Sequence, residues 1–374
     1  MTGDTMEAFI RKMIKKRHGG LINYAEYMEQ ALYHPEYGYY MAEKAKIGRD
    51  GDYITTSNFS DIYGNIMAKW YAGLCSELGI PAAVCELGGG NGRFAKAFLD
   101  GWKKYSENTL TYILVEASPY HQNLQRSLLD AYHHVSFFDS MSDIQKFSGL
   151  FFSNELFDAL PVRVVKNEGG SLMEVMVGVN GEKRILEEVL VPLCDDEVKS
   201  FLMKEGYELA EGQRMEIPLA MLRMTESISH ALAASIIVTA DYGYRKADWM
   251  EPERMDGSLR GYENHSMVRN VLRHPGDMDI TSHVHFDALI SKGEECGMHF
   301  LEILPQDRFF LEIGILDELA ECYDPNPFSE TSRRNRAIRS LVMPGGISPY
   351  FHVIVQEKGL GLSNGLPGSK KAME

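Results

Sequence analysis

The chain has few cysteines and no long apolar run, and each absence excludes a class of protein. Its 374 residues include five cysteines, an odd number, and no two of them have the Cys-x-x-Cys spacing of zinc or redox sites. This pattern predicts neither a disulfide framework nor a metal site and favours a reducing compartment. No apolar run approaches the roughly 20 residues that a membrane-spanning helix requires, so we expect no membrane partner.

Basic residues are also scarce relative to acidic ones. With 38 Lys and Arg against 53 Asp and Glu, the net charge is −15. Nucleic-acid binding requires a cationic surface, so we expect no nucleic-acid partner. A basic protein segment is a compatible partner, although acidic surfaces also simply keep cytoplasmic proteins soluble. The basic stretch Arg11 to Arg17 lacks the apolar run of a secretory signal, and Asp4 and Glu7 interrupt the face of a mitochondrial presequence. We predict a cytoplasmic protein; its oligomeric state is left open.

From residue 82 onward, strand and helix patterns alternate. This alternation predicts an α/β fold with a parallel, doubly wound, Rossmann-like sheet that has helices on both faces. The turn signals Glu168-Gly169-Gly170 and Asn180-Gly181 indicate a β-rich segment, followed by a helical one at 195–234. The expected sheet strands lie at 82–87, 112–115, 135–138, 149–153 and 235–240.

These patterns predict the domain organisation. We expect an N-terminal helical or lid region at 1–81, and a Rossmann-like core formed by 82–158 and 235–358. Residues 159–234 would then be an inserted subdomain of β-hairpins and helices between the fourth and fifth strands. The tail at 359–374 is rich in Gly, Ser and Lys and is expected to be disordered.

A glycine-rich turn, Glu86-Leu87-Gly88-Gly89-Gly90-Asn91-Gly92, follows the first of these strands. Glycines let the backbone come close to a ligand, and the following helix begins with unpaired N–H groups. Dinucleotide sites use G-x-G-x-x-G, whereas this turn reads G-x-G-x-G with Arg93 in place of the third glycine. An acidic residue two positions before G-x-G is typical of methyltransferases, so the turn favours S-adenosylmethionine over NAD. The alternative is a glycine-rich turn without a ligand.

Glu116 and Asp139 lie at the ends of the next two expected strands. A carboxylate at the position of Glu116 can accept hydrogen bonds from both hydroxyls of a ribose. Because S-adenosylmethionine and NAD both carry ribose, Glu116 does not separate the two cofactors. Asp139 could contact an adenine amino group, or could instead cap a turn or a helix.

Three polar residues, Asn154, Glu155 and Asp158, follow the fourth expected strand. Ligands of open parallel sheets bind at the carboxyl ends of the strands, so we expect these side chains over the reactive end of the cofactor. Asn154 offers both an acceptor and donors, and the two carboxylates could grip a guanidinium. The alternative is structural: Asp158 caps a helix and Glu155 lies on the surface.

Several segments, taken in order along the chain, resemble the MidA family. The matches are Gly20 to Met28 with its N-terminal signature, Gly51-Asp52-Tyr53-Ile54-Thr55-Thr56 with G-D-F-x-T-S, Ser153 to Val162 with E-F-F-D-A-L-P-V, Asp241-Tyr242-Gly243 with D-Y-G, Ser258 to Tyr262 with L-R-G-Y, and Asp279 to Val284 with D-x-T-x-x-V. Their order and spacing cover nearly the whole chain and are specific in combination.

The resemblance implies a class I methyltransferase fold and S-adenosyl-L-methionine as the cofactor. The mitochondrial members of the family are complex I assembly-factor methyltransferases, which implies protein arginine as the substrate. By position, Gly51, Asp52 and Thr55 would close over the cofactor. By the same correspondence of positions, Glu86, Gly88 and Gly90 would hold the cofactor. Arg260 and His283 would line the substrate side.

The sequence leaves open both the acceptor of the methyl group and two rival functions. For a guanidine acceptor, Glu155 or Asp158 would stabilise the developing cation and help to remove its proton. For a hydroxyl or carboxylate acceptor, His265 or His283 would be the more natural base. The rival functions are an NAD-dependent oxidoreductase and a non-catalytic assembly factor that keeps the fold and binds a partner.

Overall fold

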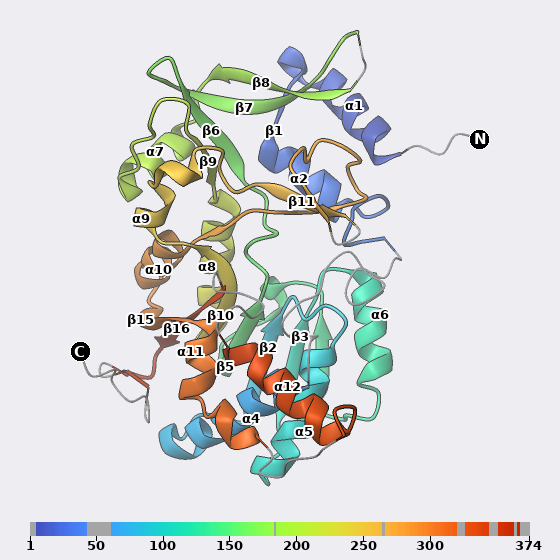
Figure 1. Ribbon diagram of the computed structural model, residues 1–374, viewed down its shortest axis with the longest axis vertical. Coiled ribbons are helices and arrows are strands. Elements are labelled where there is room, and N and C mark those ends of the chain that lie inside the picture. The colour runs from blue at the N-terminus through green and yellow to red at the C-terminus, as the bar shows by residue number, and fades with distance from the viewer. Residues whose placement is uncertain are drawn as a thin grey trace. The chain divides into compact units, whose positions relative to one another are not determined.

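The computed structural model describes residues 5–42, 61–182, 185–263, 266–319, 326–343, 351–362 and 365–366. Two compact units are formed from interleaved segments of the chain (Figure 1). Unit 1 consists of Met1–Tyr53, Phe157–Thr225 and Gly243–Lys292, and unit 2 of Ile54–Leu156, Glu226–Tyr242 and Gly293–Glu374. The domain boundaries expected from the sequence stay a prediction. Within the described ranges, no helix has both the length and the apolar character to cross a bilayer.

Unit 2 is built around a twisted, mostly parallel sheet with the strand order β15-β16-β10-β5-β2-β3-β4. Strands β10, β5, β2, β3 and β4 are parallel, and β16 is antiparallel to both of its neighbours. The strand bounds are β2 Ala83–Leu87, β3 Thr111–Val115, β4 Val135–Phe138, β5 Phe147–Asn154, β10 Leu232–Tyr244, β15 His299–Pro305 and β16 Phe351–Lys358. The α/β, Rossmann-like prediction is confirmed, and all five expected strands are present.

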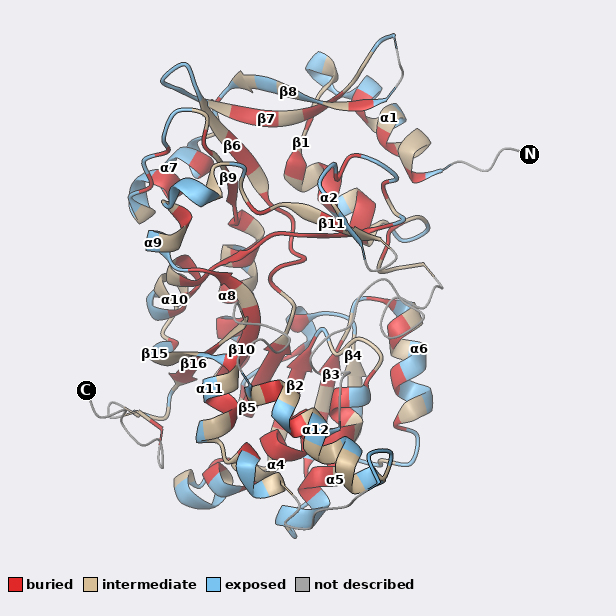
Figure 2. Ribbon diagram, in the orientation of Figure 1, coloured by how far each residue is buried: buried red, intermediate tan, exposed pale blue. Residues whose placement is uncertain are grey.

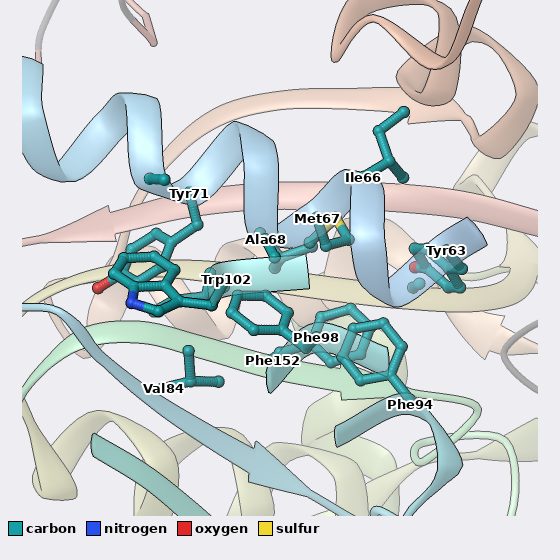
Figure 3. Close-up of a cluster of buried hydrophobic side chains, with 14 of the residues drawn as sticks. Tyr63, Ile66, Met67, Ala68, Tyr71, Val84, Phe94, Phe98, Trp102 and Phe152 are labelled. Atoms are coloured by element: carbon teal, nitrogen blue, oxygen red, sulfur yellow. The ribbon is translucent and has the colours of Figure 1, made fainter. Parts of the chain in front are cut away.

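Apolar side chains from helices pack onto this sheet and form the core of unit 2. The helices that contribute to this core are α4 (Ile62–Leu78), α5 (Arg93–Tyr105), α11 (Gln306–Glu312) and α12 (Glu330–Val342). Figure 3 shows the contact between α4, α5 and the sheet, where the rings of Phe94 and Phe152 stack with centroids 4.4 Å apart. The central strands are buried along nearly their whole length (Figure 2), as expected for a parallel sheet covered on both faces.

Unit 1 has a five-stranded antiparallel sheet in which β1-β7-β6-β9 are neighbours and β8 also pairs with β7. Helices α1 and α2 contribute side chains to its apolar core. A smaller sheet has the order β12-β11-β13. The bounds are α1 Met6–Lys16, β1 Ile22–Asn23, α2 Tyr24–Tyr33, β6 Arg163–Glu168, β7 Ser171–Val179, β8 Leu186–Pro192, α7 Asp196–Glu205, β9 Arg214–Ile217, α9 Lys246–Trp249, β11 Arg260–Glu263, β12 Ser266–Val268, β13 Asp279–Thr281 and β14 Val284–His285.

The segment of unit 1 and unit 2 expected to be helical is divided by a strand. The segment 195–234 is not one helical stretch, because β9 separates α7 from α8 (Leu219–Ala231). Gly206 ends α7 in the left-handed conformation (φ 65°), and β9 then pairs antiparallel with β6. Helix α6 spans Pro119–Leu128, and α10 spans Phe286–Glu295.

Candidate cofactor and acceptor site

The strand ends of unit 2 meet at one edge of its sheet. In the parallel register Leu87 is opposite both Val115 and Ser153, and Val115 is opposite Phe138. The chain proceeds from β2 through β3 to β4 in one direction and resumes at β5 on the other side of β2. Such a reversal opens a crevice outside the carboxyl ends of the two strands, and ligands of doubly wound sheets bind there.

The glycine-rich turn lies at this edge, between β2 and α5. Gly88 (φ 75°) and Gly92 (φ 79°) both have left-handed backbone conformations that disfavour any side chain. A Cβ atom at Gly88 would stand 2.9 Å from the Cδ1 atom of Leu156. Gly92 is the N-cap of α5, so the turn delivers the positive end of this helix to the carboxyl edge.

Glu116 ties the turn to the end of β3. Its Oε2 accepts a hydrogen bond from the backbone N–H of Gly90 (3.1 Å), and its Oε1 accepts one from that of Ser118 (2.9 Å). Gln125 of α6 donates to the carbonyl of Gly90 (2.8 Å) and so fixes the turn from the other side. Each carboxylate oxygen can accept more than one hydrogen bond, so these contacts are compatible with the predicted role of Glu116 toward a ribose.

Glu86 lies beneath the turn and is 4 % exposed. Burial raises the pKa of its carboxyl to about 7, the hydrogen bond from the Tyr112 hydroxyl opposes this rise, and the negative charge of Glu116 adds to it. The Tyr112 oxygen lies 2.7 Å from Glu86 Oε2. Glu86 therefore supports the turn from below through a carboxyl group that gains a proton near neutral pH.

Asp139 lies directly after β4 and is exposed. Its Oδ1 accepts a hydrogen bond from the side-chain amide of Gln122 (2.7 Å), and the same amide donates to the carbonyl of Glu116 (2.6 Å). Asp139 therefore belongs to the same edge as Glu116, linked through α6. Its predicted contact with an adenine stays a prediction.

Asn154 ends β5, and Glu155 follows it at the reversal point of the sheet. Glu155 adopts a left-handed backbone conformation (φ 50°), which is unusual for a residue with a side chain and recurs at functional sites. Its N–H donates to the carbonyl of Ala240 (2.9 Å), and Asn154 Nδ2 donates to Glu155 Oε1 (3.0 Å). Asn154 Oδ1 is buried and has no hydrogen-bond partner within the described residues.

Two residues that the sequence analysis missed lie close to this group. Tyr63 of α4 and Gln306, the first residue of α11, are both buried in unit 2. The pKa of Tyr63 is raised chiefly by burial, and the charges of Glu155 and Glu86 raise it further, which places the three groups near one another. Nothing in the sequence around Tyr63 marks it, because α4 reads as an ordinary apolar helix.

Asp158, Arg260 and His283 come together in unit 1. The carbonyl of Asp158 accepts a hydrogen bond from the N–H of Ser282 (2.9 Å), the residue before His283. An Nη2 atom of Arg260 lies 3.0 Å from His283 Nδ1. Four other predicted site residues, Gly51, Asp52, Thr55 and His265, lie outside the described residues.

Hydrogen bonding defines the proton positions on two histidines of unit 1. A guanidinium can only donate, so His283 Nδ1 accepts from Arg260 and the ring proton is on Nε2. His285 Nε2 lies 2.8 Å from the carbonyl of Glu216 and must donate to it, so its Nδ1 accepts from the Tyr207 hydroxyl (3.1 Å). Burial lowers the pKa of His285 to about 3, and burial together with nearby arginines lowers the pKa of His283. Both rings are neutral at physiological pH.

The residues at the edge of unit 2 fit a nucleoside cofactor that carries an amino-acid group. The Gly88 turn leaves no room for a side chain, Glu116 offers a carboxylate at the ribose position, and Asn154 Oδ1 is a buried acceptor that lacks a donor within the described part of the chain. A dinucleotide would place a pyrophosphate at the turn beside Glu86, which electrostatic repulsion disfavours. Fold and site together define a class I methyltransferase.

Comparison with known proteins identifies the family. Residues 66–304 match the family described as "Putative S-adenosyl-L-methionine-dependent methyltransferase", and the chain belongs to it. The chain is 26 % identical over 343 residues to the mitochondrial protein arginine methyltransferase NDUFAF7 of Bos taurus, covering 83 % of this chain and 74 % of that protein. The Danio rerio protein of the same name is 26 % identical over 301 residues, with coverages of 72 % and 68 %.

A solved structure agrees with this assignment along almost the whole chain. The crystal structure of a COG1565 superfamily member and likely methyl transferase from Burkholderia thailandensis, bound to S-adenosyl-homocysteine, superposes with a TM-score of 0.87. It is 27 % identical, and the match covers 96 % of this chain and 95 % of that one. The chain is thus an S-adenosyl-L-methionine-dependent methyltransferase, and the cofactor prediction is confirmed. The rival function of an NAD-dependent oxidoreductase, which the spacing of the glycine-rich turn disfavours, is not supported.

Proposed function

We propose that this methyltransferase modifies an arginine side chain of a protein substrate. The carboxylate of Glu155 at the end of β5 carries the proposal, because its left-handed backbone and its hydrogen bond from Asn154 fix it at the reversal point of the sheet. A carboxylate suits a guanidinium acceptor, which it can bind through paired hydrogen bonds. The names of the Bos taurus and Danio rerio relatives support an arginine acceptor.

The proposed roles follow from position. When bound, S-adenosylmethionine supplies a methyl group already activated by its sulfonium. Glu116 and the Gly88 turn hold the nucleoside part, and Asp139 is proposed to contact the adenine. Glu155 orients the acceptor nitrogen, stabilises the positive charge that develops on it and then helps to remove its proton. Asn154 holds Glu155 in place through its side-chain amide.

Other predicted residues keep their proposed roles. Gly51, Asp52 and Thr55 are proposed to close over the cofactor. Asp158 is proposed as a second carboxylate for the acceptor, and His265 stays a candidate base for a hydroxyl or carboxylate acceptor. The cytoplasmic location also stays a prediction; the animal relatives are named as mitochondrial proteins.

The proposal is tested by identifying the methylated amino acid. Purified protein and S-adenosylmethionine with a tritiated methyl group are incubated with proteins from source cells that lack the gene. Acid hydrolysis and chromatography then assign the label. We expect labelled methylarginine with the wild-type protein and with Glu107→Gln, a matched change at an exposed glutamate of unit 2, and a loss of at least about tenfold with Glu155→Gln. Label on any other amino acid would refute the arginine proposal.

A further inference from the structure

Unit 1 contains two arginines, Arg254 and Arg260, that have no ion pair with any described carboxylate. Arg260 donates from Nε to the carbonyl of Ser258 (2.9 Å) and from Nη2 to His283. Its three remaining N–H groups have no partner within the described residues. Arg254 Nε is buried and has no hydrogen-bond partner there either. In a chain with a net charge of −15, two half-buried guanidinium groups without a carboxylate call for a physical explanation, because burying an unpaired charge is costly.

The two arginines belong to one stacked assembly. Arg254 lies over the ring of Tyr244, with its Cζ 4.2 Å from the ring centroid. The ring of His283 stacks on the same Tyr244 at a centroid distance of 4.3 Å and an angle of 3°. Two groups this close to one centroid must occupy opposite faces of the ring, so the order is Arg254, Tyr244, His283, with Arg260 bonded to the histidine. Burial is the main cause of the lowered pKa of His283, and the positive charges of Arg260 and Arg254 lower it further.

A rigid polar support holds the arginine end of this assembly. Ser258 Oγ accepts a hydrogen bond from the N–H of His283 (2.9 Å) and donates one to Glu216 Oε2 (2.9 Å). Glu216 is fully buried, also accepts from the N–H of Ser258 (2.8 Å) and faces Arg214 at 3.9 Å. This carboxylate is therefore engaged with Ser258 and Arg214. Arg260 itself begins β11, where it is opposite Thr281 of β13.

The neutral state of His283 leaves the positive charge of both arginines unbalanced. Its Nδ1 is occupied by Arg260, and protonation would add a third positive charge beside the two guanidinium groups. The neutral ring of His283 therefore accepts a hydrogen bond from Arg260 and orients its guanidinium group. The planar guanidinium of Arg260 matches a carboxylate in bidentate geometry.

We propose that Arg260 forms an anion site in unit 1 that binds a carboxylate group, and that Arg254, on the far face of Tyr244, adds to the positive charge around this site without contacting the ligand. The carboxylate is that of an acidic residue of the protein substrate. The proposal does not depend on which group accepts the methyl, because it concerns binding alone. Loss of the charge-assisted contacts of Arg260 is expected to weaken carboxylate binding on the order of tenfold to a hundredfold.

The test uses the full chain and two nucleosides that differ in the carboxylate. S-adenosylhomocysteine and 5′-methylthioadenosine, which lacks the amino-acid group, are titrated calorimetrically into the wild type, Arg260→Gln and Arg223→Gln. Arg223 is a matched control, since it forms an exposed ion pair with Glu197 in the same unit. Weaker binding of S-adenosylhomocysteine, but not of 5′-methylthioadenosine, to Arg260→Gln would overturn the assignment of the carboxylate to the substrate.

A second measurement covers an acidic substrate residue. Sodium acetate is titrated at constant ionic strength, with chloride as the balancing salt, and the melting temperature is followed. If acetate stabilises the wild type and Arg223→Gln but not Arg260→Gln, while S-adenosylhomocysteine binds all three equally, the carboxylate belongs to the substrate. Stabilisation by phosphate and not by acetate would overturn the choice of carboxylate.

The proposal is overturned if Arg260→Gln and Arg223→Gln have the same nucleoside affinities and the same change in melting temperature with acetate. If Arg260→Gln does not fold, as judged by circular dichroism, Arg260→Lys and Arg254→Gln replace it. Arg260→Lys keeps the charge and loses the planar fork, so we expect a smaller loss than for removal of the charge. The two proposals can fail separately. If the wild type binds both nucleosides but the hydrolysate contains no methylarginine, the arginine proposal fails while the anion-site proposal is still decided by the Arg260 variants.

Discussion

Replacing Glu86 with glutamine should make unit 2 more stable at alkaline pH and leave it nearly unchanged at acid pH. The native pKa of Glu86 is about 7, whereas the ordinary value is 4.5. The native state thus holds this proton more tightly than the unfolded chain does. The resulting stabilisation is fully present below pH 4.5 and is lost as the pH rises through 7.

The magnitude follows from the shift in pKa. A difference of about 2.5 pKa units corresponds to about 3 kcal/mol of unfolding free energy, at 1.36 kcal/mol per unit. Glutamine has nearly the same shape, keeps an acceptor for the Tyr112 hydroxyl and cannot ionise. The difference in unfolding free energy between Glu86→Gln and the parent protein should therefore rise by about 2.5 kcal/mol between pH 5 and pH 8.5, because a small part of the effect is already present at pH 5.

The assay must report on unit 2 alone. Two of the three tryptophans, Trp70 and Trp102, lie in unit 2 and contribute to its core. A Trp249→Phe background removes the third, whose indole N–H has no hydrogen-bond partner within the described residues. Denaturant unfolding is then followed by tryptophan fluorescence, with Glu107→Gln as the control. A stability difference that is the same at pH 5 and pH 8.5 would refute the reasoning.

Three further results are expected. Glu155→Gln should lower kcat by about a hundredfold and change the S-adenosylhomocysteine affinity less than about threefold. Equal losses of kcat and of calorimetrically measured affinity would contradict a catalytic role. Gly88→Ala should destabilise unit 2 by about 1–3 kcal/mol in denaturant unfolding, since its φ is 75°; unchanged stability would show that the turn relaxes freely. His285 should stay neutral with its proton on Nε2 down to about pH 4, because its native pKa is about 3. Titration of His285 near pH 6.5, as detected by nitrogen NMR, would be incompatible with the hydrogen bonds described. This lowered pKa predicts that unit 1 loses stability as the pH falls from 6.5 toward 3.

The sequence predicted the parts of the structure that depend on local pattern. The strands of unit 2 are short apolar runs, and residues placed directly after them, such as Glu116, Asp139 and Asn154, must meet at one edge once the sheet is parallel. The glycine-rich turn was recognisable because its chemistry depends on backbone conformation. For the same reason the cofactor class could be predicted before any contact was known.

Long-range packing explains what the sequence could not predict. Strand β9 lies in a stretch that reads as helical and is selected by pairing with β6, a partner about 50 residues earlier in the chain. Tyr63 and Gln306 lie close to each other although they are far apart in sequence, and neither stands in a motif. The proton positions on His283 and His285 depend on single donors and acceptors brought in by other elements. No local pattern carries this information.

The central claim is that the carboxyl edge of unit 2 binds S-adenosylmethionine through Glu116 and the glycine-rich turn. Calorimetric titration of the wild type and Glu116→Ala with S-adenosylmethionine, with NAD as a control ligand, tests it most directly. We expect saturable binding to the wild type, binding weaker by on the order of tenfold or more to Glu116→Ala, and no heat of binding with NAD. Equal affinity of the two proteins for S-adenosylmethionine, or saturable binding of NAD at the same site, would contradict it.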